Sequence, residues 1–219
     1  VFGEAAARWG PREFLVAPPR GGDGLRLSYA DTARMVTDWT LALSAAGYGP
    51  GHRVAVLIGN RPEHMALKLA LNAIGVSIVP VNPDYQPAEI AYLLDDSAAA
   101  FAVTDADHAA ALRAGIAESG REVPAVMLEA LGGAVPPAPE APRGALGPQT
   151  EASLLYTSGT TGRPKGCILS HEYELMVGAR YLACGGLMAL GEGERVLNPL
   201  PLYHINAGVV SFLGMLLSG

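Results

Sequence analysis

Lysine is almost absent from this sequence of 219 residues, whose two lysines are Lys68 and Lys165. Charged residues make up 16% of the chain, the net charge is −6, and no block of basic residues occurs. A nucleic-acid-binding surface needs a concentrated positive field, so this composition argues against a nucleic-acid partner. Because lysine is rare, a lysine inside a loop that suits a ligand is a stronger candidate for a functional residue.

Cysteine and long apolar runs are also scarce. Cys167 and Cys184 have neither a metal-ligand spacing nor the number needed for a disulfide framework. Cys167 lies in an apolar run, which predicts a buried, reduced thiol. No apolar run is long enough to span a membrane, and the first residues lack the pattern of a secretory signal. We therefore expect a cytoplasmic protein without a transmembrane segment.

Half of the residues are apolar, and they are arranged in two alternating patterns. Continuous apolar runs, typical of strands buried on both faces, alternate with helical segments over short connections. The runs lie at residues 53–58, 76–81, 100–103 and 123–128, and the helices at 29–46, 62–74, 88–94 and 105–118. Shorter strands are expected at residues 14–16 and 25–28. The alternation predicts an α/β fold with a mostly parallel sheet flanked by helices on both faces.

The alternation divides the chain into two parts. Residues 1–150 form an α/β subdomain that ends in a connection rich in Pro, Ala and Gly at 132–148. In residues 151–219 we expect a strand at 195–197 and a buried helix at 207–217. The sequence stops within an apolar pattern with no closing element, so we expect a piece of a longer protein.

Residues 154–171, which read LLYTSGTTGRPKGCILSH, are the most informative stretch. An apolar run leads into six small residues at 157–162, and Lys165 follows shortly after. Small residues let the backbone approach a ligand closely, and consecutive N–H groups in such a loop form an anion-binding concavity. Hydroxyl groups and the lysine ammonium add further donors. The stretch predicts a phosphate-binding loop.

Two familiar nucleotide-binding patterns do not fit this loop. The Walker pattern needs Gly-Lys-Ser/Thr at the start of a helix, but here Pro164 precedes the lysine and an apolar, strand-like run follows Gly166. The dinucleotide-binding pattern G-x-G-x-x-G needs a third glycine, and none stands at the required position relative to Gly159 and Gly162. We therefore expect the loop to join two strands, with no helix beginning at Lys165.

The pattern Tyr-Thr-Ser-Gly-Thr-Thr-Gly-x-Pro-Lys-Gly at residues 156–166 resembles the signature loop of the adenylate-forming superfamily. This superfamily includes acyl-CoA synthetases, aryl-CoA ligases, luciferases and peptide-synthetase adenylation domains. Weaker resemblances lie at residues 27–29, 71–83 and 201–204. The likeness covers the whole chain but the first half or less of a typical member. It implies the N-terminal portion of the large AMP-binding domain, with the start of the acyl pocket in residues 151–219 and the small C-terminal domain absent.

The resemblance implies an ATP-dependent chemistry. A carboxylic acid is activated to an acyl-adenylate and then transferred to coenzyme A. Mg²⁺ would bridge phosphate oxygens, with Thr157 as one protein ligand. A homodimer is compatible with the resemblance. The residues implied to hold the β- and γ-phosphates are Thr157, Ser158, Gly159, Thr160, Thr161, Gly162 and Lys165.

The resemblance also assigns a substrate region around His204, Asn206 and Val210. His204 is either a hydrogen-bonded structural residue or a group beside the acyl carboxylate and the thiol path, where it could be catalytic. Domains that activate amino acids usually carry an aspartate here, and residues 203–206 contain none, which favours an acid without an α-amino group. The family's acidic Mg²⁺ ligand, ribose aspartate and catalytic lysine are expected beyond Gly219. We therefore expect little or no ligase activity from these residues alone.

Three alternatives stay open. One is an adenylate-forming ligase with a different acceptor, such as an adenylation domain. Another is a phosphate-loop hydrolase of a different class, which needs an acid at the end of a neighbouring strand. The polar residues that we expect at such ends are Asn82, Asp84 and Asn198. The third is a non-catalytic fragment that binds a nucleotide.

Overall fold

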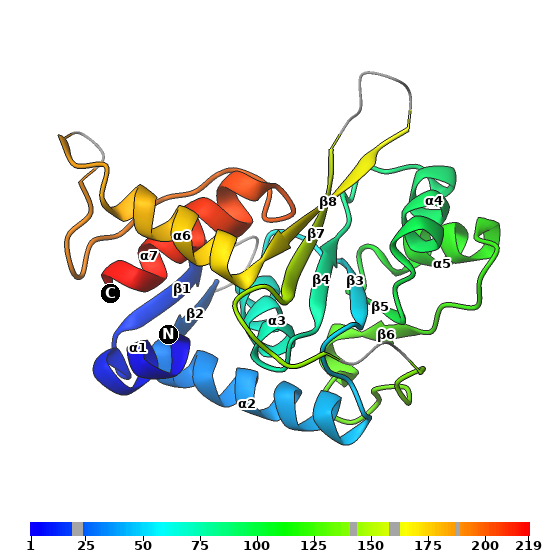
Figure 1. The fold of residues 1–219 in the computed structure, drawn as a ribbon, viewed down its shortest axis with the longest axis horizontal. Helices are drawn as coiled ribbons and strands as arrows, with labels where there is room; N and C mark the ends of the chain where they lie inside the picture. The colour runs from blue at the N-terminus through cyan, green and yellow to red at the C-terminus, as the bar shows by residue number, and fades with distance from the viewer. Residues whose placement is uncertain (19–23, 141–143, 158–162, 187–188) are drawn as a thin grey trace.

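A computed structural model describes residues 1–18, 24–140, 144–157, 163–186 and 189–219. Its centre is a six-stranded sheet with the order β6-β5-β3-β4-β7-β8 (Figure 1). All neighbouring strands are parallel except β8, which pairs antiparallel with β7 at the edge. The strands are β3 (Arg53–Leu57), β4 (Ser77–Pro80), β5 (Phe101–Thr104), β6 (Ala125–Met127), β7 (Glu151–Thr157) and β8 (Lys165–Ser170). The predicted, mostly parallel α/β sheet is confirmed.

Helices cover both faces of this sheet. The side chains of Val54 and Val56 face α2 (Tyr29–Ala45) and α3 (Pro62–Ala73). Those of Ala55 and Leu57 face α4 (Pro87–Ser97) and α5 (Ala109–Glu118) on the opposite side. Successive side chains of a strand point to opposite faces, so an uninterrupted apolar strand needs a helical layer on each. A short 3₁₀ turn, η1 (Leu128–Ala130), follows β6.

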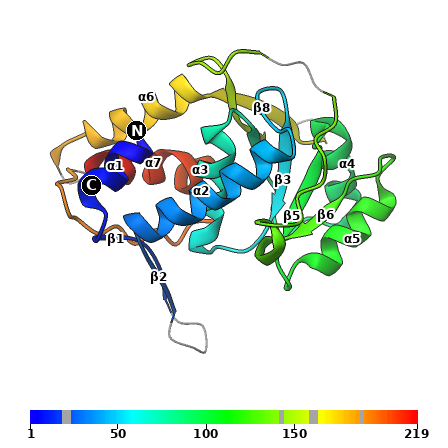
Figure 2. The same ribbon diagram turned by 90° about the horizontal axis from the view of Figure 1, so that it is seen from below.

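A third apolar cluster joins the two ends of the chain. It packs α1 (Phe2–Trp9) and β1 (Glu13–Ala17), which forms a hairpin with β2 (Leu25–Ser28), against η3 (Asn206–Ser211) and α7 (Phe212–Ser218). Helix α6 (His171–Leu182) follows β8 and packs against α7. The β1–β2 hairpin projects from the body in Figure 2, and both termini lie on its side of the molecule. Within the described ranges, no helix is both long and apolar enough to cross a membrane.

Local sequence signals set the starts and ends of the helices. The Ser28 side chain accepts from the Asp31 N–H while Asp31 accepts from the Ser28 N–H, which is the reciprocal capping box expected at the start of α2. Pro62 occupies the first turn of α3, where a missing N–H costs nothing. Gly75 ends the same helix with φ +75°, a conformation that suits glycine.

The start of α5 differs from the prediction. The sequence pattern placed the start of this helix at Asp105, but α5 begins at Ala109 with His108 as the N-cap. Asp105 instead turns its carboxylate toward the backbone N–H of Gly59 (3.0 Å) and of His108 (3.1 Å). Because Asp105 bonds Gly59 in the turn after β3, α5 begins four residues later than predicted.

Two further predictions are wrong for the same physical reason: the residues lack a neighbouring strand or helix that would pair with them or cover them. Residues 195–197 form no strand, and Leu197 is 87% exposed, because none of the described strands lies beside them. Cys167 is exposed rather than buried, since β8 is an edge strand whose first four residues are all exposed. An apolar run therefore did not guarantee burial.

Candidate functional site

The two ends of the predicted phosphate loop meet across a hairpin. Thr157, the last residue of β7, is paired with Lys165, the first residue of β8, and both side chains are exposed. No helix begins at Lys165, so the expectation that the loop joins two strands is confirmed and the Walker alternative is excluded. The remaining predicted loop residues, Ser158, Gly159, Thr160, Thr161 and Gly162, lie outside the described residues.

Helix α4 holds the chain on both sides of the loop. The Tyr92 hydroxyl donates to the Pro164 carbonyl (3.0 Å), and the Arg163 guanidinium lies 5.5 Å from the centre of the Tyr92 ring. On the other side, the Tyr156 hydroxyl donates to the Asp96 carboxylate (2.6 Å). Burial, and then the bond to Asp96, raise the pKa of Tyr156, so the phenol keeps its donor proton. Sequence reasoning missed these contacts because nothing in the α4 pattern marks its partners.

This hairpin mouth lies where open α/β sheets bind ligands. Parallel strands end at a common edge, and ligands occupy the crevice outside the carboxyl ends of those strands. Thr157 contributes a hydroxyl and Lys165 a mobile cation, which together suit phosphate oxygens. Mg²⁺ held mainly by phosphates and water needs few protein ligands, so one neutral Thr157 oxygen fits that role. Among the described residues, no group of three or more His, Cys, Asp or Glu could hold a metal by itself.

The predicted substrate segment at residues 201–204 crosses the same edge. Asn60, in the turn after β3, donates to the Leu200 carbonyl (3.1 Å) and accepts from the Leu202 N–H (2.9 Å). Strand β3 is two places from β7 in the sheet, a separation of about 10 Å at the usual strand spacing. The structure therefore brings this segment and the loop to one side of the sheet.

His204 precedes η3, Asn206 is its first residue and Val210 lies near its end. His204 Nδ1 accepts from the Asn206 N–H (3.4 Å), and the Asn206 amide oxygen accepts from the Ser211 hydroxyl (3.2 Å). The side chains of His204 and Asn206 are exposed, and Val210 is half-buried. No hydrogen bond or ion pair between described residues connects these three to Thr157 or Lys165.

The predicted buried helix at 207–217 needs a correction in its first half. Residues 206–211 form a π-helix, and α-helical geometry begins at Phe212. A methyl group on Gly208 would lie 2.3 Å from the Leu202 carbonyl oxygen, so the absent side chain lets this turn pack against residues 201–204. Single π turns in helices are frequent at functional sites.

Asp105 is a polar strand end that sequence reasoning missed. It follows β5 and is buried, and besides its two backbone contacts it bonds the His108 ring (2.5 Å). Burial alone would raise the pKa of Asp105, but hydrogen bonds from Gly59 and His108, with the charge of His108, lower it overall. β5 lies three places from β7, and this carboxylate already has partners. It therefore does not supply the acid that the hydrolase alternative requires.

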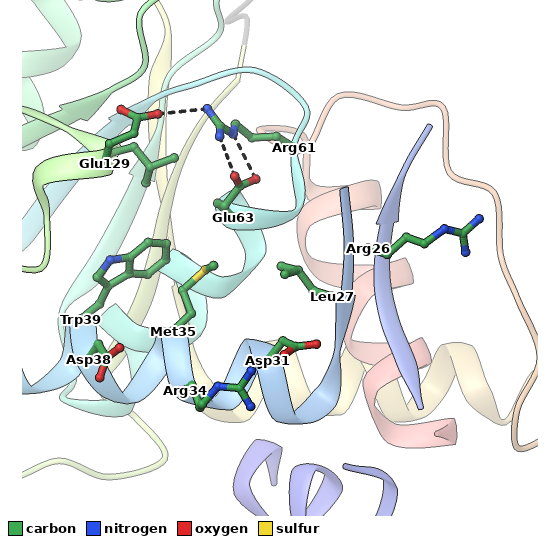
Figure 3. A pocket seen from close by; sticks show the side chains of 11 residues that line it. Arg26, Leu27, Asp31, Arg34, Met35, Asp38, Trp39, Arg61, Glu63 and Glu129 are labelled. Carbon is green, nitrogen blue, oxygen red and sulfur yellow. Dashed lines mark hydrogen bonds and ion pairs between the residues drawn. The ribbon is translucent and has the colours of Figure 1, made fainter. Parts of the chain in front are cut away.

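A cavity of about 630 Å³ lies away from the loop, between β2, α2, the start of α3 and η1 (Figure 3). Its arginines all have acidic partners: Arg26 pairs with Glu13, Arg34 with Asp31, and Arg61 with Glu63 and Glu129. Figure 3 shows Arg61 reaching between its two glutamates at the rim. With its positive charge neutralised, this cavity is a poor site for a nucleotide phosphate, whereas the exposed Lys165 is a better one.

Three comparisons with known proteins agree with this geometry. The family model described as AMP-binding enzyme matches residues 2–219. Sulfoacetate–CoA ligase of Cupriavidus necator is 32% identical over 98% of this chain, and feruloyl-CoA synthase of an Amycolatopsis species is 34% identical over 90%. The inhibitor-bound N-terminal domain of FACL13 from Mycobacterium tuberculosis superposes with a TM-score of 0.83 at 25% identity over the whole chain.

The chain is shorter than these relatives. It spans 42% of the sulfoacetate–CoA ligase, 38% of the feruloyl-CoA synthase and 54% of the FACL13 domain. A structure of O-succinylbenzoate coenzyme A synthetase from Bacillus subtilis with ATP and magnesium ion has a TM-score of 0.75 at 21% identity. At that identity, the likeness shows the fold alone.

Proposed function

This chain belongs to the AMP-binding enzyme family, and from that premise we propose that it is the N-terminal portion of an acyl-CoA ligase. The whole enzyme uses ATP to convert a carboxylic acid into an acyl-adenylate and transfers the acyl group to coenzyme A. The observation that carries the proposal is the β7–β8 hairpin, whose mouth presents Thr157 and Lys165 side by side. Residues 1–150 supply four strands of the sheet, and residues 151–219 supply its other two strands, the proposed phosphate loop and the first part of the proposed acyl pocket.

In this proposal the loop binds the β- and γ-phosphates of ATP. Adenylation breaks the bond between the α- and β-phosphates, and negative charge grows on the departing pyrophosphate. The Lys165 ammonium and a set of N–H and O–H donors stabilise that charge without forming a covalent bond to it. The residues that we assign to this task are Thr157, Ser158, Gly159, Thr160, Thr161, Gly162 and Lys165. Thr157 would supply the protein oxygen for Mg²⁺, which would add positive charge against the phosphates.

The acid is proposed to enter between the loop and the start of η3. Residues 203–206 contain no carboxylate that could pair with an α-ammonium group, so an organic acid without an α-amino group is favoured. His204, Asn206 and Val210 are the proposed lining residues. The relatives are named for acids as different as sulfoacetate and ferulate, so we propose the class of substrate and not its size. A cytoplasmic location and a homodimer remain predictions.

Acid-dependent exchange of pyrophosphate into ATP tests the proposal directly. The full-length ligase is assayed with sulfoacetate, ferulate, a series of fatty acids and the amino acids, each compared with a blank that lacks acid. We expect exchange with at least one acid without an α-amino group, and an acyl-CoA product when coenzyme A is added. Exchange with amino acids alone would favour an adenylation domain with another acceptor. Exchange with no acid in the panel would refute the acyl-CoA ligase.

A further inference from the structure

Lys68, the second lysine of the chain, lies inside the molecule and is 3% exposed. Its ammonium on α3 donates to the Ser153 hydroxyl on β7 (2.8 Å) and to both carboxylate oxygens of Glu174 on α6 (2.8 and 3.0 Å). The Ser153 hydroxyl donates in turn to Glu174 (2.5 Å), which closes a triangle of contacts. Removing two charges from water is costly, and apolar residues of similar volume often stabilise a fold as well or better. The triangle therefore requires a reason other than stability.

That reason lies in how the β7–β8 hairpin is attached to the rest of the six-stranded sheet. Strands β3 and β4 align at four residue pairs, whereas β4 and β7 align at one, Ile78 with Ser153. A slip of a strand by one residue would move every side chain to the opposite face, so the contacts that hold a residue of β7 in place determine where the hairpin lies. Ser153 is thus both the aligned residue of β7 and the residue that Lys68 holds.

Side chains from the core fix the start of β7 at consecutive residues. Arg53 binds the Glu151 carboxylate through two nitrogens (2.7 and 2.8 Å). The Asn72 amide donates to the Ala152 carbonyl (2.7 Å), and Lys68 then holds Ser153. Four residues further along, β7 ends at Thr157, the first residue of the loop.

Glu174 connects the same ammonium to the chain beyond the loop. It lies in the first turn of α6, which begins directly after β8 and is capped by Ser170. The buried Lys68 ammonium is therefore bonded to β7, which leads into the loop, and to α6, which follows β8 after the loop. These bonds add directional contacts to the apolar packing that holds β7 in place.

We propose that Lys68, Ser153 and Glu174 form a register lock that sets the position of the β7–β8 hairpin and so of the phosphate loop. Lys68 is a positioning residue in this arrangement and touches no substrate. The inference rests on the proposed function, because the effect of the lock is measured as kcat/KM for ATP in adenylation. Displacing a loop by about 1 Å can lower a rate by up to about a hundredfold.

The decisive variant is Lys68→Met/Glu174→Leu in the full-length ligase. It removes both charges and keeps the volume, so the thermal midpoint should stay at or above that of the wild type. We expect kcat/KM for ATP in pyrophosphate exchange to fall about tenfold while KM for the acid stays unchanged. Ser153→Ala, which leaves the ion pair intact, should fold normally and lower kcat/KM for ATP by a smaller factor.

Arg26→Met is the control. It removes a cation that pairs with Glu13 across the β1–β2 hairpin, which projects from the body of the molecule (Figure 2). This change should leave kcat/KM for ATP unaltered and alter the thermal midpoint only slightly, because an exposed ion pair contributes little to stability. Wild-type kcat/KM for ATP in a folded double variant would overturn the register lock, and if that variant does not fold, the same result in Ser153→Ala overturns it.

Hydrogen exchange separates this inference from the proposed function. Amides of residues 153–157 should exchange faster in Ser153→Ala than in the wild type, whereas those of α5 should not change. Hydrogen exchange needs no substrate, so this test remains valid even if the enzyme shows no acid-dependent pyrophosphate exchange. Unaltered protection of β7 would also overturn the lock.

Discussion

The two lysines of this chain have opposite surroundings and therefore different roles. Lys68 is enclosed by a carboxylate and a hydroxyl from two other elements, so its charge is used inside the fold. Lys165 is exposed at the mouth of the β7–β8 hairpin, and within the described part of the chain its ammonium has no hydrogen bond or ion pair. A mobile, unpaired ammonium is available to an incoming phosphate, whereas a buried and paired one is not.

Replacing Lys165 by alanine should therefore impair adenylation. We expect kcat for pyrophosphate exchange to fall by about a hundredfold, the size of effect seen when one charge-stabilising donor is lost. Thioester formation from supplied acyl-adenylate, which releases no pyrophosphate, should fall much less. Both half-reactions are measured on the same enzyme preparation. Lys165→Arg serves as the charge-retaining control, and an equal loss in both half-reactions with alanine would contradict the assignment.

His64 makes the stability of the domain depend on pH. It is fully buried on α3, and burial, with a smaller contribution from Lys68, lowers its pKa to about 4. Neither ring nitrogen has a hydrogen-bond partner among the described residues. Since the unfolded state binds a proton near pH 6.5 and the folded state does so near pH 4, stability should fall as the pH drops between these values.

The variant His64→Leu isolates this effect. Between pH 7.5 and 5.5 the wild type should lose about 1 kcal/mol of unfolding free energy more than the variant, as measured by urea unfolding. At pH 7.5 the variant should be at least as stable, because it removes two buried ring nitrogens without partners. His171 also has a pKa lowered by burial, but it is present in both proteins and so cancels from the difference. Parallel pH profiles would refute the prediction.

Residue roles were predictable from the sequence only where their partners are nearby. Lys165 was identified because its loop is contiguous and its pattern resembles a known one. Lys68 was not, because its partners Ser153 and Glu174 are 85 and 106 residues away. Cys167 was misassigned since hydrophobicity alone cannot distinguish an edge strand from a central one.

At the scale of elements, local chemistry predicted most of the helices and strands but not their irregular ends. The capping pair of Ser28 and Asp31 and the proline at residue 62 act within one turn, so the sequence reveals them. The start of α5 and the π-helix η3 depend on contacts with Gly59 and Leu202, which lie elsewhere in the chain. Tertiary contacts override local preference at such places.

The π-helix should be sensitive to a single methyl group. Gly208→Ala places a Cβ 2.3 Å from the Leu202 carbonyl oxygen, so either η3 or the segment before it must shift. We expect KM for the acid to rise and the unfolding free energy to fall by about 1–3 kcal/mol, with KM for ATP little changed. Gly132→Ala is the control, since a methyl group there meets nothing within 4 Å. An unchanged KM for the acid would separate η3 from the acyl pocket.

For the whole molecule, alternation predicted the fold class but not the order of strands. The sequence indicated parallel strands with helices on both faces, and the structure agrees. Nothing in the sequence indicated that β4 pairs with β7, because β5 and β6 lie between these two strands along the chain. That placement brings Asn60, the substrate segment and the loop to one edge, and it arises from side-chain contacts such as that between Asn72 and Ala152.

The last prediction concerns the 219 residues as a separate polypeptide. They span 42% of the sulfoacetate–CoA ligase, and in the proposed function they supply the phosphate contacts and the beginning of the acid pocket. Adenylation also requires the ribose, the acid carboxylate and the α-phosphate to be held in line, and positioning of this kind provides much of the rate. We expect the isolated chain to be folded by circular dichroism and to show no acid-dependent pyrophosphate exchange above background. Exchange at a rate close to that of the full-length ligase would mean that these residues contain every group the first half-reaction needs.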